Sequence, residues 1–198
     1  RNFRRLDNQI PFIEDRVSRA LTILHTYVVY AKLLIFPLHL SCDYSYSAVR
    51  NIAGFTDPRN VDTLCLLFVS VIILSLIVRV RPARRRARLG LCVVWFGATF
   101  SPAANLFFYP GLFIAERVLY LPSLGYTWLL SELLCSVREA RSHKTTPRAR
   151  AAGPRANLFI AGLAVCVAAL GWRTFCRNAD WSSQATLFQS ALEVVPGS

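Results

Sequence analysis

Two adjacent charged residues, Glu116 and Arg117, stand between long apolar stretches of the sequence. At the mouth of a membrane helix such a pair is costly unless it faces a polar cavity, so charge in this position indicates a functional site by default. The alternative is that both residues lie at the level of the lipid headgroups and anchor the helix. The residues by themselves leave both interpretations open.

No other group of residues forms a recognisable catalytic pattern. The three histidines share no metal-ligand spacing with cysteines or acids, and the chain has neither a glycine-rich phosphate loop nor a nucleophile elbow. The six cysteines lie far apart and four of them fall inside apolar runs, which is typical of small hydrophobic residues rather than of a disulfide framework. The sequence therefore predicts no metal site and no cofactor. The residues concerned are His25, His39, His143, Cys42, Cys65, Cys92, Cys135, Cys166 and Cys176.

The composition is that of a membrane protein. Of the 198 residues, 54% are hydrophobic and only 17% are charged, whereas roughly a quarter are charged in ordinary soluble domains. Twenty-four aromatic residues and long aliphatic runs exclude low-complexity disorder. Because the chain opens on Arg1 and contains no methionine, we expect it to be a piece of a longer protein.

Five apolar segments predict a polytopic all-α membrane protein. A helix satisfies its own backbone hydrogen bonds in lipid, whereas an open sheet leaves them unpaired. The segment 63–78 has no charge, and the segment 89–109 is interrupted by Ser101 and Pro102. The five expected spans are residues 21–40, 63–78, 89–109, 118–137 and 156–172, within a transmembrane domain covering residues 1–178.

The positive charge is concentrated in two loops between these segments. Six arginines fall in residues 79–88 and six basic residues in 138–155, and Glu139 is the single acid among them. Basic clusters can bind nucleic acid, but short basic loops between apolar segments are typical of the positive-inside rule. We therefore expect these two basic clusters to set the orientation of the chain in the membrane rather than to bind a ligand. Both clusters are predicted to be cytosolic, which puts 41–62, 101–117 and the tail on the opposite side. Residues 1–20 fit either side.

Three stretches resemble a known family. DNQIPFIEDRVSRALTILHTYVVYAKLLIFPLHLSCDYSYSAV (7–49) with TDPRN (56–60) is similar to the characteristic domain of the transmembrane and tetratricopeptide-repeat-containing O-mannosyltransferases. SPAANLFFYPGLFIAERVLYLPSLGY (101–126) resembles the most distinctive stretch of that family, and ADWSSQATLFQSALEVVPGS (179–198) resembles the join into its repeats. Two departures are Ala48-Val49-Arg50, where the family usually has an Ile-Pro pair, and Asp7-Asn8-Gln9, where it has an Asp-Asn-Pro-like opening.

The resemblance implies a multi-pass enzyme of the endoplasmic-reticulum membrane with a glycosyltransferase C-like helix bundle. It would transfer mannose from dolichyl phosphate mannose to Ser or Thr of secretory-pathway proteins, cadherins being the family's known substrates. Its partners would be membrane lipids, the dolichol-linked donor and those acceptors, without nucleic acid. On this basis Arg117 is the candidate for the donor's phosphate, which a guanidinium holds bidentately. Glu116 would orient Arg117, and Asp43 would be a secondary polar contact. The general base is expected upstream of Arg1.

The tail, residues 179–198, is amphipathic at helical spacing and agrees with the first helix of a luminal tetratricopeptide repeat. One such helix cannot bury its apolar face alone, so an array would continue past Ser198. A second function class stays open, namely a non-enzymatic membrane scaffold that presents luminal repeats, or a transporter. An acidic pair between the first two membrane helices of the full chain would favour the enzyme.

Overall fold

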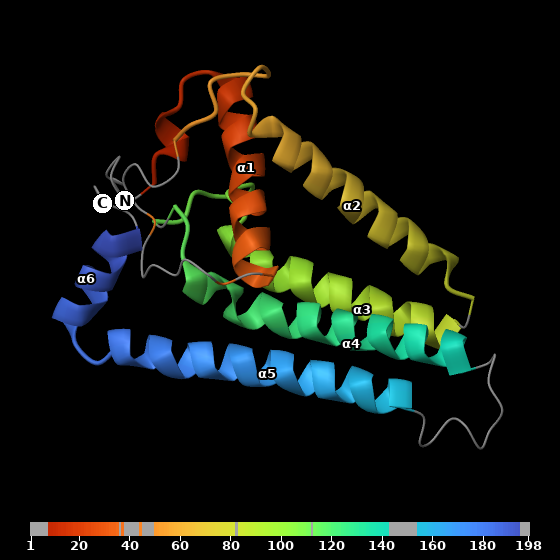
Figure 1. The fold of residues 1–198 in the computed structure, drawn as a ribbon. Coiled ribbons are helices and arrows are strands. Elements are labelled where there is room, and N and C mark those ends of the chain that lie inside the picture. The colour runs from red at the N-terminus through yellow and green to blue at the C-terminus, as the bar shows by residue number, and fades with distance from the viewer. Residues whose placement is uncertain are drawn as a thin grey trace. The chain divides into compact units, whose positions relative to one another are not determined.

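The computed structural model of this chain describes residues 8–35, 37, 44, 50–81, 83–111, 113–142 and 154–194, and the regular structure in these ranges is helical. The helices are shown in Figure 1. The chain divides into two units, one formed by Arg1–Leu129 with Ala191–Ser198 and the other by Leu130–Ser190. The expected all-helical fold class is confirmed at this level.

Among the residues that the structure describes, three helical stretches are long and apolar enough to cross a membrane: Asn60–Arg79, which is α2, Glu116–Cys135, and Ile160–Asp180. The most apolar window of each stretch has a mean hydropathy of 2.7, 1.2 and 1.3, respectively. In the most apolar window of each stretch, 11%, 17% and none of the residues, respectively, are buried within the protein. Apolar side chains left this exposed need lipid or another helix around them. The three stretches overlap the expected spans 63–78, 118–137 and 156–172.

The first and third expected spans differ from the helices observed. Helix α1 (Arg16–Ile35) includes arginines at its N-terminal end, and helix α3 (Ala83–Phe100) begins inside the arginine-rich loop. Neither is among the three candidate spans of the described residues. The segment 89–109 was expected to be interrupted at Ser101 and Pro102, and α3 ends directly before them, where a 3-10 turn, η2 (Ser101–Ala103), follows. Pro102 has no N–H to continue the α-helical ladder, and this explains the break.

Helix α1 begins at Arg16 because Asp15 caps it. The Ser18 N–H donates to Asp15 Oδ2 over 2.8 Å, and the Val17 N–H donates to Asp15 Oδ1 over 3.3 Å. These bonds satisfy amides that have no partner inside the helix. They also stabilise the ionised carboxylate, so the hydrogen bonds from Ser18 lower the pKa of Asp15.

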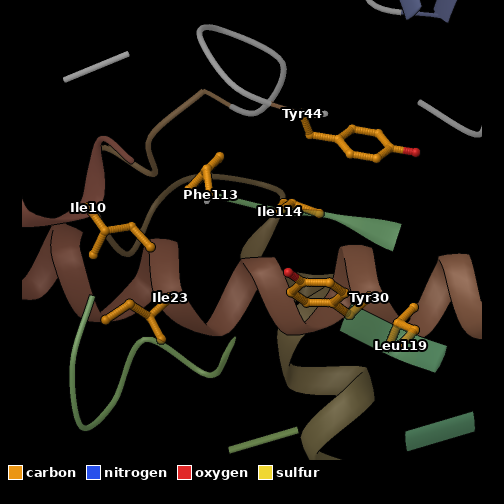
Figure 2. Packing of buried hydrophobic residues seen from close by; sticks show 7 residues of the cluster. All are labelled: Ile10, Ile23, Tyr30, Tyr44, Phe113, Ile114 and Leu119. Atoms are coloured by element: carbon orange, nitrogen blue, oxygen red, sulfur yellow. The ribbon is translucent and has the colours of Figure 1, made fainter. Parts of the chain in front are cut away.

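The hydrophobic core of the first unit lies along α1. Its buried side chains come from α1 and from segments distant in sequence, as Figure 2 shows. Ile10 lies in the 3-10 turn η1 (Ile10–Phe12), Leu119 in the 3-10 turn η3 (Glu116–Leu119), and Phe113 directly before η3. The core therefore fixes both turns against α1. The buried members are Ile10, Ile23, Tyr30, Tyr44, Phe113, Ile114 and Leu119.

Helix α4 (Tyr120–Ser142) follows η3, and its first part approaches α3 closely at Gly125. A Cβ atom on Gly125 would lie 2.8 Å from the Cys92 carbonyl oxygen, so only glycine fits without a shift of the backbone. Beside it, the Trp95 Nε1–H donates to the Leu121 carbonyl over 3.1 Å. Small residues permit such close helix contacts in membrane proteins.

The second unit contains the rest of α4, helix α5 (Pro154–Asp180) and most of helix α6 (Gln184–Val194). Ser183 starts α6 because its Oγ accepts from the Thr186 N–H over 3.2 Å and Thr186 Oγ1 accepts from the Ser183 N–H over 3.2 Å. This reciprocal pair is a capping box. Arg177 ties α5 to α6, since its Nη1 donates to Asp180 and to Ser190.

Candidate functional site

The polar face of α1 is buried against the chain segment 50–60. Ser18 Oγ donates to the Ala53 carbonyl over 3.1 Å, and Thr22 Oγ1 accepts from the Ile52 N–H over 3.0 Å. Ile52 is fully buried. Buried hydroxyls need such partners because an unpaired one costs roughly 1–3 kcal/mol. The polar residues of α1 thus organise a loop.

This loop is closed by an ion pair. The Arg59 Nη2 atom lies 2.6 Å from Asp57 Oδ2, and the same guanidinium donates to the carbonyls of Arg50 and Asn51. The hydrogen bond from Arg59 lowers the pKa of Asp57 from 3.8 to about 2. The bond to Asp57 likewise raises the pKa of Arg59. In the first turn of α2, which follows this loop, Asp62 forms an ion pair with Lys32 of α1 over 2.7 Å. This pair joins the two helices.

A second polar network joins the N-terminal segment to the loop after α3. The buried Asn8 amide donates to Asn105 Oδ1 and to the Pro110 carbonyl, both over 2.9 Å. Asn105 has φ 54°, a left-handed conformation that asparagine tolerates better than most residues. Tyr27 of α1 donates to the Ala104 carbonyl over 2.6 Å. The residues between η2 and Pro110 are therefore held by side chains from two distant segments.

Glu116 contacts Tyr44, which stands next to the predicted site residue Asp43. The Tyr44 hydroxyl donates to Glu116 Oε1 over 3.4 Å, and the Tyr44 N–H donates to the Ile114 carbonyl, also over 3.4 Å. Tyr44 is buried, and Ile114 beside it is fully buried. Tyr44, from the chain between α1 and α2, therefore contacts Glu116 of η3 and Ile114 just before it.

Arg117 lines a pocket of about 480 Å³. Its walls come from α1, the end of α3, η2, the loop before η3, η3 itself and the start of α4. Apart from Arg117 most of the lining is apolar or aromatic, and in the described part of the chain no hydrogen bond or ion pair engages the guanidinium. A solvated pocket of this size with one cation fits an anionic group attached to an apolar body. Lining residues include Tyr30, Phe108, Pro110, Arg117, Val118 and Tyr120.

The three predicted site residues have different surroundings. Arg117 lines the pocket and is exposed, whereas Glu116 is half-buried and forms no ion pair with Arg117. The contacts of the described residues therefore do not include one between Glu116 and Arg117 that would support the expected orienting role of Glu116. Asp43 lies outside the described residues.

Two residues of the pocket region escaped the sequence analysis. Tyr30 lines the pocket, and its hydroxyl accepts from the Ala115 N–H over 3.3 Å, which supports the backbone just before Glu116. Asn8 holds Pro110, a residue of the pocket wall. Tyr30 looked like one more apolar position of a span, and no local signal distinguishes it. Asn8 lies in the stretch 7–49 that resembles the family, and this resemblance was the signal that pointed to its neighbourhood.

Comparison with known proteins gives one consistent result. Residues 1–72 match the family described as Protein O-mannosyl-transferase TMTC, DUF1736. The chain is similar to Protein O-mannosyl-transferase Tmtc3 of Drosophila melanogaster, with 31% identity over 194 residues, 97% of this chain and 20% of the relative. It is 31% identical to human TMTC4 over 194 residues, 98% of this chain and 25% of the relative. With mouse TMTC3 it shares 31% over 193 residues, 97% of this chain and 19% of the relative.

The chain thus spans between 19% and 25% of the length of these three relatives. The match covers nearly all of this chain in each case. No solved structure matches it.

Proposed function

We infer that the chain belongs to the TMTC protein O-mannosyl-transferase family over the part it shares with these relatives. On this premise we propose that it is part of a membrane enzyme that transfers mannose from dolichyl phosphate mannose to Ser or Thr hydroxyls. Acceptors are secretory-pathway proteins such as cadherins. The observation that carries this proposal for the present residues is the Arg117 pocket, whose lining is mostly apolar and whose guanidinium bonds to none of the described residues.

In this reaction the bond between mannose C1 and the phosphate oxygen breaks, and a glycosidic bond to the acceptor oxygen forms. The acceptor proton passes to a general base, which we place upstream of Arg1. Dolichyl phosphate leaves with its charge increased, and a guanidinium near that phosphate stabilises the departing group. Arg117 takes this role in the proposal, with Asp43 as a secondary polar contact and Glu116 held by Tyr44 beside it.

Exposed apolar side chains beside the pocket support a lipid-linked donor. Phe108 lines the pocket. The two residues that precede it in the sequence, Leu106 and Phe107, have 65% and 79% of their surface exposed. The candidate span that starts at Glu116 places this region at one end of a membrane helix. An isoprenoid chain offers those side chains an apolar partner that water does not.

The remaining features of the proposal follow the family. The helices belong to a glycosyltransferase C-like bundle in the endoplasmic-reticulum membrane, and the pocket and the tail face the lumen. Residues 1–178 form the transmembrane domain. Helix α6, with its capping box, is the first helix of a luminal tetratricopeptide array that starts at residue 179.

Mannosyl transfer by the full-length protein, normalised to folded protein, tests the role of Arg117. Arg117→Lys loses the bidentate geometry, so donor use should fall roughly tenfold to a hundredfold, equivalent to about 1.5–3 kcal/mol for a charge-assisted contact. Arg117→Ala should be worse. The matched control is Arg50→Ala, which removes an exposed arginine outside the pocket and should leave transfer unchanged.

Two outcomes contradict the proposal. Equal normalised activity of wild type, Arg117→Lys and Arg117→Ala removes Arg117 from the donor site. No transfer by the wild-type full-length protein favours the scaffold or the transporter instead. The 198-residue piece alone should show no transfer, and activity from it would overturn the placement of the general base.

A further inference from the structure

We propose that the α2–α3 arginine cluster, the six arginines of residues 79–88, goes beyond the orienting role expected from the sequence and also binds the phosphate headgroups of anionic phospholipids. The cluster lies in the connection between two helices that contact one another, and Figure 1 shows α2 and α3 converging on it. It is distinct from the Arg117 pocket, whose lining includes none of its residues. The members are Arg79, Arg81, Arg84, Arg85, Arg86 and Arg88.

The cluster stands at the end of the most apolar candidate span. The most apolar window of α2 has a mean hydropathy of 2.7, and the helix ends at Arg79. Val80 then turns the chain in an extended conformation, with its N–H bonded to the Ile77 carbonyl over 3.1 Å, and α3 starts at Ala83. An apolar helix of 20 residues spans the hydrocarbon layer, so its final residue reaches the headgroups. The cluster is therefore placed at the depth of lipid phosphates.

The protein leaves much of this charge uncompensated. Arg79, Arg81, Arg84 and Arg86 are exposed, and among the described residues none of the four takes part in a hydrogen bond or an ion pair. The sequence contains no Asp or Glu from residue 63 to residue 115. The first turn of α3 has no acidic residue, so the positive end of its dipole adds to the arginines instead of being neutralised.

Lipid phosphate fits this placement better than nucleic acid does. Ile77 and Val78 precede the cluster and an apolar stretch from Leu89 follows it, so an extended duplex would have to approach across the apolar ends of two helices. Anionic headgroups are already at this depth. Basic clusters directly beside a membrane helix gain about 1 kcal/mol per residue from them, which corresponds to roughly fivefold per arginine.

The test measures the binding of fluorescent phosphatidylserine and phosphatidylcholine by the full-length protein, purified in a neutral detergent so that membrane orientation does not enter. Wild type should prefer phosphatidylserine, and added salt should weaken the binding. The triple variant Arg81→Gln/Arg84→Gln/Arg86→Gln should lose about a hundredfold in affinity. The same three positions changed to lysine keep the charge and should restore most of the binding.

A control of equal charge change is Arg1→Gln/Arg4→Gln/Arg5→Gln, which should retain phosphatidylserine binding. Equal loss in both triple variants would show that net charge alone acts, and this would overturn the site. If wild type bound an oligonucleotide duplex and showed no preference for phosphatidylserine over phosphatidylcholine, the assignment of lipid phosphate as the ligand would be overturned. Should the glutamine triple variant fail to fold, the salt dependence and lipid preference of wild type, together with the single variant Arg84→Gln, still decide the question.

Discussion

The Asn8 side-chain amide donates a hydrogen bond to Asn105 Oδ1 over 2.9 Å, joining two buried residues that are 97 positions apart. The same amide reaches the Pro110 carbonyl, and the Ile10 N–H returns a bond to Asn8 Oδ1. One side chain therefore holds the left-handed turn at Asn105, a wall residue of the Arg117 pocket and the N-terminal turn η1.

Replacing Asn8 by alanine should destabilise the fold. It leaves the Ile10 N–H and the Pro110 carbonyl without this partner in a buried place, at a cost of roughly 1–3 kcal/mol. Thermal unfolding of the full-length protein in detergent measures the effect. The exposed Asn51, changed to alanine, is the matched control and should unfold as wild type does. Identical melting of Asn8→Ala and wild type would disprove the structural role of Asn8.

Gly125 should tolerate no side chain. In Gly125→Ala the new methyl group would lie 2.8 Å from the Cys92 carbonyl oxygen, and separating α3 from α4 to relieve this costs roughly 1–3 kcal/mol. The control is Gly97→Ala on α3, where nothing lies within 4 Å of the added carbon, so the variant should be as stable as wild type or slightly more so. The melting temperatures of the two variants check this, and the opposite order would contradict the close helix contact.

The Asp57–Arg59 pair should make the loop 50–60 sensitive to acid. The pKa of Asp57 is about 2 in the folded protein against 3.8 ordinarily, because Arg59 donates hydrogen bonds to the carboxylate. A lowered pKa means that the stabilisation is fully present above about pH 4 and is lost as the pH falls through about 2. Wild type should therefore melt above Asp57→Asn at neutral pH, with a difference that shrinks toward pH 2. A difference independent of pH would contradict this.

The charge pattern predicts the orientation of the loops. In sealed microsomes a single cysteine introduced by Arg85→Cys, in a background without the native cysteines, should react with an impermeant reagent at once, because we expect residues 79–88 to be cytosolic. Phe55→Cys, at an exposed position of the opposite loop, should react only after the membrane is permeabilised. Protection of the Arg85 position before permeabilisation would reverse the assignment.

The sequence by itself determined the apolar helices and the distribution of charge. Helix α2 and the apolar part of α5 were predictable because a membrane helix satisfies its own backbone, so length and hydropathy suffice. The family resemblance was also detectable from the sequence, because it depends on the order of the residues along the chain and not on their contacts in space. The site roles of Asp43, Glu116 and Arg117 were predicted from this resemblance, and they stay predictions.

Only the tertiary structure decided what those residues touch. In the sequence, Ser18 and Thr22 are polar positions among apolar ones. In the structure they bond to the backbone of Ala53 and Ile52, and these bonds hold α1 against the loop 50–60. Glu116 contacts Tyr44 rather than its neighbour Arg117, and Arg117 lines a pocket without a hydrogen bond to any residue that the structure describes. These pairings join residues 30 to 72 positions apart, and contacts over such separations depend on how the helices pack, which no local pattern in the sequence encodes.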